Sequence, residues 1–399
     1  MNDSKTIESE HSGQNLLNIG WPEYFKSIMC RFSLKDDNVI NILLNVFFIT
    51  AFFVVTYAGN IYVLFSIALS LVILLNSFNP NRHLKTNTFY YFIFAYFVFL
   101  SFVYYFIRDF RDSYRIVKTM SILLPVLFIP THINIRVSKL LHYFLALNVL
   151  LIYLDFILYY AIGQTITKED FSGSIVRLGG LMEDSNFYSF AIVCYIQYLY
   201  LKAKKYNKFF VISVFLSASF SSILLLFGIF VFNTLIKHFN KKAVIFSVFL
   251  SLSLFVIYYY SIVSFSDISD TYALDNYSLN VKIVSLATRF DLQYQALMSD
   301  EFLFGIGAGK TIDFTDIGLN LHNSYLQIFL EMGLFLLLPV LLLIVAYFHK
   351  MKNNYIPLFM MMLFLGNIME VIYFPIIPFI LFLSISTNNE TPATNKLNI

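Results

Sequence analysis

The stretch IYVLFSIALSLVILLNSF, residues 61–78, carries no charged side chain and is apolar on every face of a helix. At 1.5 Å per residue, roughly 18 to 20 such residues cross a hydrocarbon core about 30 Å thick. Similar runs recur from residue 39 almost to the C-terminus. A strand of a membrane β-barrel would instead alternate in polarity over about ten residues. The stretch therefore predicts a helical membrane protein.

The composition agrees with this class. Hydrophobic residues make up 58% of the chain and charged residues only 13%, and the mean hydropathy is +0.71. A soluble domain usually has about 25% charged residues, so the solvent for most of this chain is lipid. The net charge of +3 is spread over many short loops, and no basic stripe with interleaved aromatic residues indicates nucleic acid as a partner.

The apolar runs and their flanks predict an all-α polytopic bundle of about twelve spans. The run at 209–236 has lysines at both ends, which both favour the cytoplasm, so we expect a hairpin that turns at the small residues 217–222. The last run is expected to break at Asn367 and Glu370 into two short spans, because Pro357, Pro375 and Pro378 lie nearby. The runs lie at 39–57, 61–78, 88–107, 116–133, 140–161, 185–201, 209–236, 244–263, 325–348 and 355–384.

Lys and Arg residues are more frequent in the segments that this topology assigns to the cytoplasm. It makes 1–38 a cytoplasmic tail without a cleaved signal peptide, 39–385 the transmembrane domain, and 386–399 a second cytoplasmic tail. Polar sequence then gathers on the outer side, in loops 163–184 and 264–324. Chemistry at the outer face fits this pattern better than transport, which favours charges at mid-membrane.

An arginine cluster stands in an expected outer loop, at Arg108, Arg111 and Arg115. Outer arginines run against the usual charge bias and need a reason. They either pair with Asp109 and Asp112 or bind an anionic lipid headgroup.

The first polar motif is RLGGLMEDSN, residues 177–186, at the outer end of an expected span. Its two glycines permit close backbone approach, Arg177 offers a planar fork of donors for phosphate, and Glu183 or Asp184 can accept a hydroxyl proton. The alternative is helix capping by Asp184 or Ser185.

The second polar segment is an expected amphipathic helix in the large outer loop. Apolar residues recur there at helical spacing and leave Arg289 and Gln293 on another face. Lying along the membrane, the helix would hold the Arg289 guanidinium over a lipid diphosphate; the alternative is a packed loop helix with a solvated arginine. The apolar positions are Ile283, Leu286, Phe290, Tyr294 and Leu297.

The third segment begins with FGIGAGKT, residues 304–311, which is not a nucleotide-binding loop because Phe304 occupies the place of its first glycine. We expect a flexible turn. In NLHNSYLQIFLEMG, residues 320–333, His322 is either a base or structural, and Glu331 must face protein or water. No histidine and cysteine spacing suggests zinc and no acidic loop suggests calcium, so we predict neither a metal nor a cofactor.

These three motifs, in this order, resemble the O-antigen polymerase and O-antigen ligase family. They cover about a quarter of the chain, and the remainder resembles the family only in hydropathy. The resemblance implies a helical glycosyltransferase of the bacterial inner membrane with its site facing the periplasm. It implies a glycan donor on undecaprenyl diphosphate, membrane lipid and a chain-length regulator protein as partners. One departure is SASFSS at 217–222, which lacks the arginine that members often have there.

The resemblance favours a polymerase of lipid-linked repeats. A ligase that transfers the glycan to lipid A core is the first alternative, and a lipid-linked oligosaccharide flippase is the second. The expected catalytic residues are His322, Asp184 and Glu183, and the expected substrate-binding residues are Arg177, Arg289, Asn186, Asn323 and Arg115.

Overall fold

The fold is that of a computed structural model. It describes residues 37–53, 88–129, 135–167, 169–172, 175–182, 184–239, 241–265, 278–301, 303–311, 321–367 and 375–386. The expected span 61–78 and both predicted tails, apart from residues 37, 38 and 386, lie outside this part of the chain.

In chain order the elements are α2 (Asp37–Phe53), α4 (Thr88–Ile107), α5 (Phe110–Leu127), α6 (Lys139–Ile162), β1 (Glu169–Ser172), β2 (Ile175–Leu178), η1 (Gly180–Met182), α7 (Ser185–Ala203), α8 (Lys208–Leu216), α9 (Phe220–Phe239), α10 (Lys241–Phe265), α11 (Ser278–Leu297), α13 (Ser324–Lys350), η3 (Asn353–Tyr355), α14 (Ile356–Leu365) and α15 (Ile376–Ser386).

Three helices of the described chain are long and apolar enough to cross a membrane. They span Lys139–Ile162, Val244–Ser264 and Ser324–Lys350, and shorter apolar helices accompany them. The chain is therefore a mostly helical protein of the membrane class. The count of about twelve spans stays a prediction.

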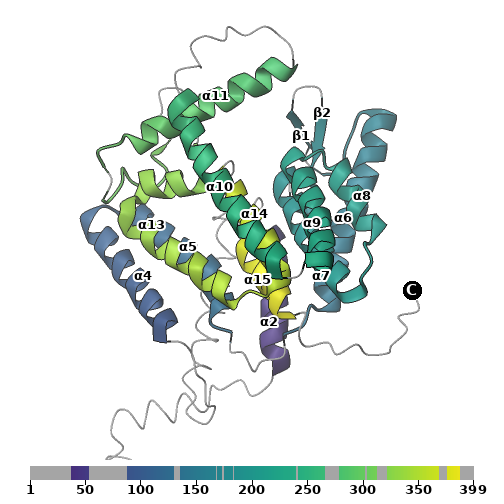
Figure 1. Ribbon diagram of the computed structural model, residues 1–399, viewed down its shortest axis with the longest axis horizontal. Coiled ribbons are helices and arrows are strands. Elements are labelled where there is room, and N and C mark those ends of the chain that lie inside the picture. Colours follow the sequence, from purple (N-terminus) through teal and green to yellow (C-terminus); the bar gives the residue numbers. More distant parts are fainter. Residues whose placement is uncertain are drawn as a thin grey trace, which may run out of the picture.

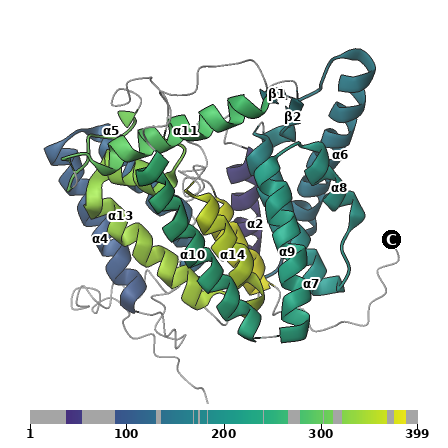
Figure 2. The ribbon, with the colours of Figure 1, turned by 45° about the horizontal axis from the view of Figure 1, so that its top comes forward.

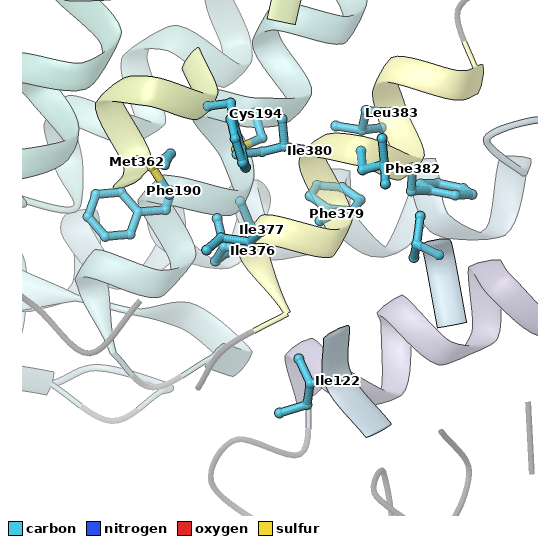
Figure 3. Packing of buried hydrophobic residues seen from close by; sticks show 14 of the residues in the cluster. Ile122, Phe190, Cys194, Met362, Ile376, Ile377, Phe379, Ile380, Phe382 and Leu383 are labelled. Atoms are coloured by element: carbon cyan, nitrogen blue, oxygen red, sulfur yellow. The ribbon is translucent and has the colours of Figure 1, made fainter. Parts of the chain in front are cut away.

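The helices form two groups joined by a central layer (Figure 1). Helices α4, α5 and α13 lie together on one side, and α6, α7, α8 and α9 lie on the other, with α2, α14 and α15 between them. Figure 3 shows α15 against Phe190 and Cys194 of α7. On its other side the centroid of the Phe379 ring lies 5.1 Å from that of Phe48 of α2, with the two rings tilted relative to each other. The central layer thus packs as a continuous apolar core.

Two predicted breaks are confirmed. The run 209–236 divides into α8 and α9, with Ala218 at φ 54 in the turn between them. Helix α8 has only 9 residues, which extend about 14 Å and so reach half-way across a bilayer. The last run likewise divides into α14 and α15.

One element departs from the all-α prediction. The segment 163–184, which the sequence predicts as an outer loop, contains a two-stranded antiparallel hairpin, in which Asp170 pairs with Arg177 in the backbone register. Val176 and Leu178 are buried, whereas Arg177 between them is not. This alternation with period two is a strand pattern, which the search for long apolar runs does not detect.

Helix α13 is broken at Gly333, which has φ 67 and ψ −171. Residues 303–311, here called the strap, run beside the break. The strap amides of Ile306 and Gly307 donate to the carbonyls of Leu330 and Glu331 at 2.8 and 2.9 Å. The strap amides thus replace the helical hydrogen bonds that the break removes. This replacement matters because unpaired backbone groups are costly in a membrane. The expected turn is present, and these hydrogen bonds dock it against α13.

Candidate functional site

The first motif is seated on α6. Gly180 has φ +59, and a Cβ there would lie 3.2 Å from Oδ1 of Asn148. The same oxygen accepts the Leu181 amide at 3.0 Å. Glycine at 180 therefore lets the turn after β2 approach α6 and bond to Asn148.

Asp184 is the N-cap of α7. Its Oδ1 accepts the amides of Asn186 and Phe187 at 2.7 and 3.2 Å, which is the capping role that the sequence left open. Catalysis by Asp184 stays a prediction, and Glu183 lies outside the described residues.

Arg177 bonds to the first turn of α7. Its guanidinium donates to Oδ1 of Asn186 at 2.7 Å, and the Ser219 hydroxyl donates to the same oxygen at 2.8 Å. Arginine, amide and the SASFSS turn thus form one polar cluster from β2, α7 and the start of α9. Sequence reasoning predicted that turn and noted that it lacks an arginine, but it missed the contact of the turn with the motif.

Helix α11 forms as predicted, but Gln293, which was expected on its polar face, is turned inward. Gln293 is fully buried. Its Oε1 accepts from Tyr258 of α10 at 3.0 Å and from Asn323 at 3.2 Å, and its Nε2 donates to the Leu321 carbonyl at 3.0 Å. A fully bonded glutamine is stable in a core, so the simple amphipathic reading was wrong at this position. Figure 2 shows α11 lying across the ends of α10 and α13.

His322 lies just before α13 in an unusual backbone conformation, with φ 52. The next residue, Asn323, caps α13 by accepting the amides of Tyr325 and Leu326 at 3.1 Å each. The Ser324 amide donates to the Gly366 carbonyl at 2.7 Å. A positive φ outside glycine costs roughly 1 to 3 kcal/mol and persists where surrounding contacts enforce it, as they do here.

The electrostatics favour a neutral imidazole. Burial, and then the positive charge of Arg289, lower the pKa of His322 below its ordinary value. Burial also lowers the pKa of Arg289, but guanidinium starts so high that it stays charged at neutral pH. A charged donor thus stands beside a histidine that can accept a proton.

Arg115 is paired within the protein. Its guanidinium lies 3.1 Å from Oε2 of Glu331, whose side chain is 1% exposed. The other oxygen of Glu331 accepts from Thr311 at 2.8 Å and from Gln327 at 3.1 Å. The prediction that Glu331 faces protein is confirmed, and Arg115 as a substrate ligand would have to compete with this carboxylate.

The acids of the arginine cluster at 108–115 have other roles. Asp109 caps α5, and Asp112 accepts the Ala308 amide of the strap at 2.6 Å. Arg108 donates to the Gly305 carbonyl at 2.6 Å and lies 3.8 Å from Glu301. Arg108 also acts electrostatically on Asp112, so one of the two expected explanations holds in part for this arginine, while the ion pairs of Arg108 and Arg115 are with Glu301 and Glu331.

Two clusters therefore contain most of the expected site residues. One joins Arg177 to Asn186 beside the Asp184 cap, and in the other Arg289 lies within electrostatic range of His322, which precedes the Asn323 cap. Figures 1 and 2 both place the hairpin of the first and α11 of the second at the same end of the bundle. In the described part of the chain, no group of three metal-ligating side chains gathers.

Tyr258 was missed by sequence reasoning because it lies within an apolar run and has no local signal. Its phenol donates to Gln293 and, at 2.7 Å, to the Asn367 carbonyl. It thereby connects the second cluster to the break between α14 and α15.

Comparisons of the chain with protein-family models, with curated proteins and with solved structures give no match.

Proposed function

We propose that the protein is a membrane glycosyltransferase that polymerises oligosaccharide repeats carried on undecaprenyl diphosphate at the periplasmic face of the bacterial inner membrane. The observation that supports this most is the Arg289–His322 pair. It combines a permanent cation with a histidine whose pKa is lowered, at the end of the bundle that carries the polar hairpin. The order of the three motifs supports it independently.

In the proposed reaction, His322 removes the proton from an acceptor hydroxyl. The resulting oxygen attacks the anomeric carbon of the donor glycan, and the bond from that carbon to the diphosphate breaks. Undecaprenyl diphosphate leaves with its negative charge stabilised by Arg289 and Arg177. No nucleotide is needed because the donor bond supplies the free energy, and one displacement inverts the anomeric centre.

The genetic test is a gel of lipopolysaccharide from a strain that lacks this gene. Core bearing a single repeat, restored to long chains by the wild-type gene, is the expected result. Bare core with polymer retained on carrier lipid would instead indicate a ligase.

The biochemical test uses the purified protein in lipid nanodiscs with the lipid-linked repeat alone. Longer glycan is expected from the wild type, whereas a flippase would give none. Arg289→Lys keeps the charge but loses the planar fork that binds phosphate with two hydrogen bonds. Most elongation should be lost in this variant, and wild-type turnover would refute the role of Arg289.

A further inference from the structure

We propose that Gln293 is a positioning residue that fixes Arg289 and His322 as one site. The side chain is fully buried, so it does not touch a substrate in this conformation. All its contacts go to neighbouring protein groups. The inference deepens the proposed function and rests on it for the chemistry that the pair performs.

Gln293 acts on Arg289 through the geometry of α11. Arg289 and Gln293 are four residues apart, so they lie on the same face of the helix, one above the other. The Gln293 contacts to α10 and to the segment before α13 therefore also set the rotation and height of α11 at Arg289.

Gln293 also holds the segment that contains His322. Gln293 bonds to both neighbours of the histidine, to the Leu321 carbonyl at 3.0 Å and to the Asn323 amide at 3.2 Å. One side chain thus holds the backbone on each side of the strained φ of His322.

The charged and titratable groups around His322 determine how its pKa should respond to a change at Gln293. Arg289 acts on His322 through its charge, while α10 contributes phenols that contact Gln293 and Asn323 rather than a second charge. The α14 groups bonded to this region are backbone carbonyls. The phenols are Tyr258 and Tyr259, and the carbonyls are those of Gly366 and Asn367. A displaced Arg289 should therefore raise the pKa of His322.

The experiment measures carbethoxylation of His322 by diethyl pyrocarbonate against pH, in the full-length protein, by mass spectrometry of its peptide. The reagent attacks neutral imidazole, so the midpoint reports the pKa without requiring activity. In the wild type the midpoint should lie below the ordinary histidine value of about 6.5. Gln293→Leu should move it upward. The same substitution in an Arg289→Gln background should add no further shift.

The matched control is Gln197→Leu. Gln197 is also a buried glutamine, bonded to Asn233 at 3.1 Å and to the Asn354 carbonyl at 3.0 Å, and it belongs to α7. Its loss should leave the His322 midpoint unchanged. If Gln293→Leu does not fold, Gln293→Asn, which shortens the side chain by one methylene, should shift the midpoint in the same direction.

An unchanged midpoint in a folded Gln293 variant would overturn the positioning role. Elongation assays on the same samples separate this from the proposed function. A wild type that makes no polymer, together with a midpoint that shifts in Gln293→Leu, supports the positioning role and refutes the polymerase.

Discussion

The guanidinium of Arg115 on α5 lies 3.1 Å from the buried carboxylate of Glu331 on α13, beside the break in that helix. Removing one partner of a buried ion pair leaves an uncompensated charge, which typically costs about 3 to 5 kcal/mol. Arg115→Met and Glu331→Gln should each lower thermal stability in detergent by an amount of this order. The double variant should recover much of the loss.

Arg111 provides the control for this pair, because it stands one turn away on α5 and its side chain is exposed. Arg111→Met should leave the melting temperature nearly unchanged. Equal losses of melting temperature in Arg111→Met and Arg115→Met would show that the Arg115–Glu331 pair does not stabilise the protein more than an exposed arginine does.

The glycines at the α13 break should resist substitution. A Cβ at Gly333 would lie 2.0 Å from the Leu303 carbonyl oxygen, and one at Gly305 would lie 2.4 Å from the backbone of Glu331. Either alanine variant forces strap and helix apart, so we expect a loss of about 3 kcal/mol or more and poor yield of folded protein.

Substitution of Gly309 distinguishes the cost of a steric clash from the cost of an unfavourable backbone conformation. It has φ +74 in the same strap, but nothing lies within 4 Å of an added Cβ. Gly309→Ala should cost only the conformational term of about 1 to 2 kcal/mol. A loss as large as that of Gly333→Ala would contradict the docked strap.

The pH dependence of elongation should reflect His322. A base must be neutral to accept a proton, and burial together with Arg289 lowers the pKa of this histidine. Activity should therefore persist as the pH falls to about 6.5 and decline only below it. Elongation rates measured from pH 5 to 8 should show this decline. A decline that already begins above pH 6.5 would rule out His322 as the base.

Asp184 offers a test between capping and catalysis. Asparagine is an equally good N-cap, whereas alanine loses about 1 kcal/mol. Because the Asp184 side chain already caps α7, Asp184→Asn should keep both stability and elongation, and Asp184→Ala should lose stability. Loss of elongation in a stable Asp184→Asn variant would make the carboxylate the base instead.

Much of the helical layout was predictable because it depends on local composition. The expected span 88–107 matches α4 residue for residue, and the lysines around 209–236 indicated the turn before α9. Both signals reside in neighbouring residues and need no tertiary information.

Long-range partners were not predictable in the same way. Arg115 and Glu331 are far apart in sequence, and nothing local selects one acid over another as the partner. Likewise Gln293 reads as a surface residue on a hydropathy scale, because such a scale does not count the three hydrogen bonds that allow its burial.

The break at Gly333 also divides α13 mechanically. The first segment, which begins just after His322, is bonded to the strap through Leu330 and Glu331, and Tyr104 of α4 donates to the Met332 carbonyl. The second segment is held elsewhere, where Lys350 donates to carbonyls at the end of α5, including that of Leu127 at 2.6 Å. Movement of the first segment can therefore be absorbed at the Gly333 break, without tilting the second segment.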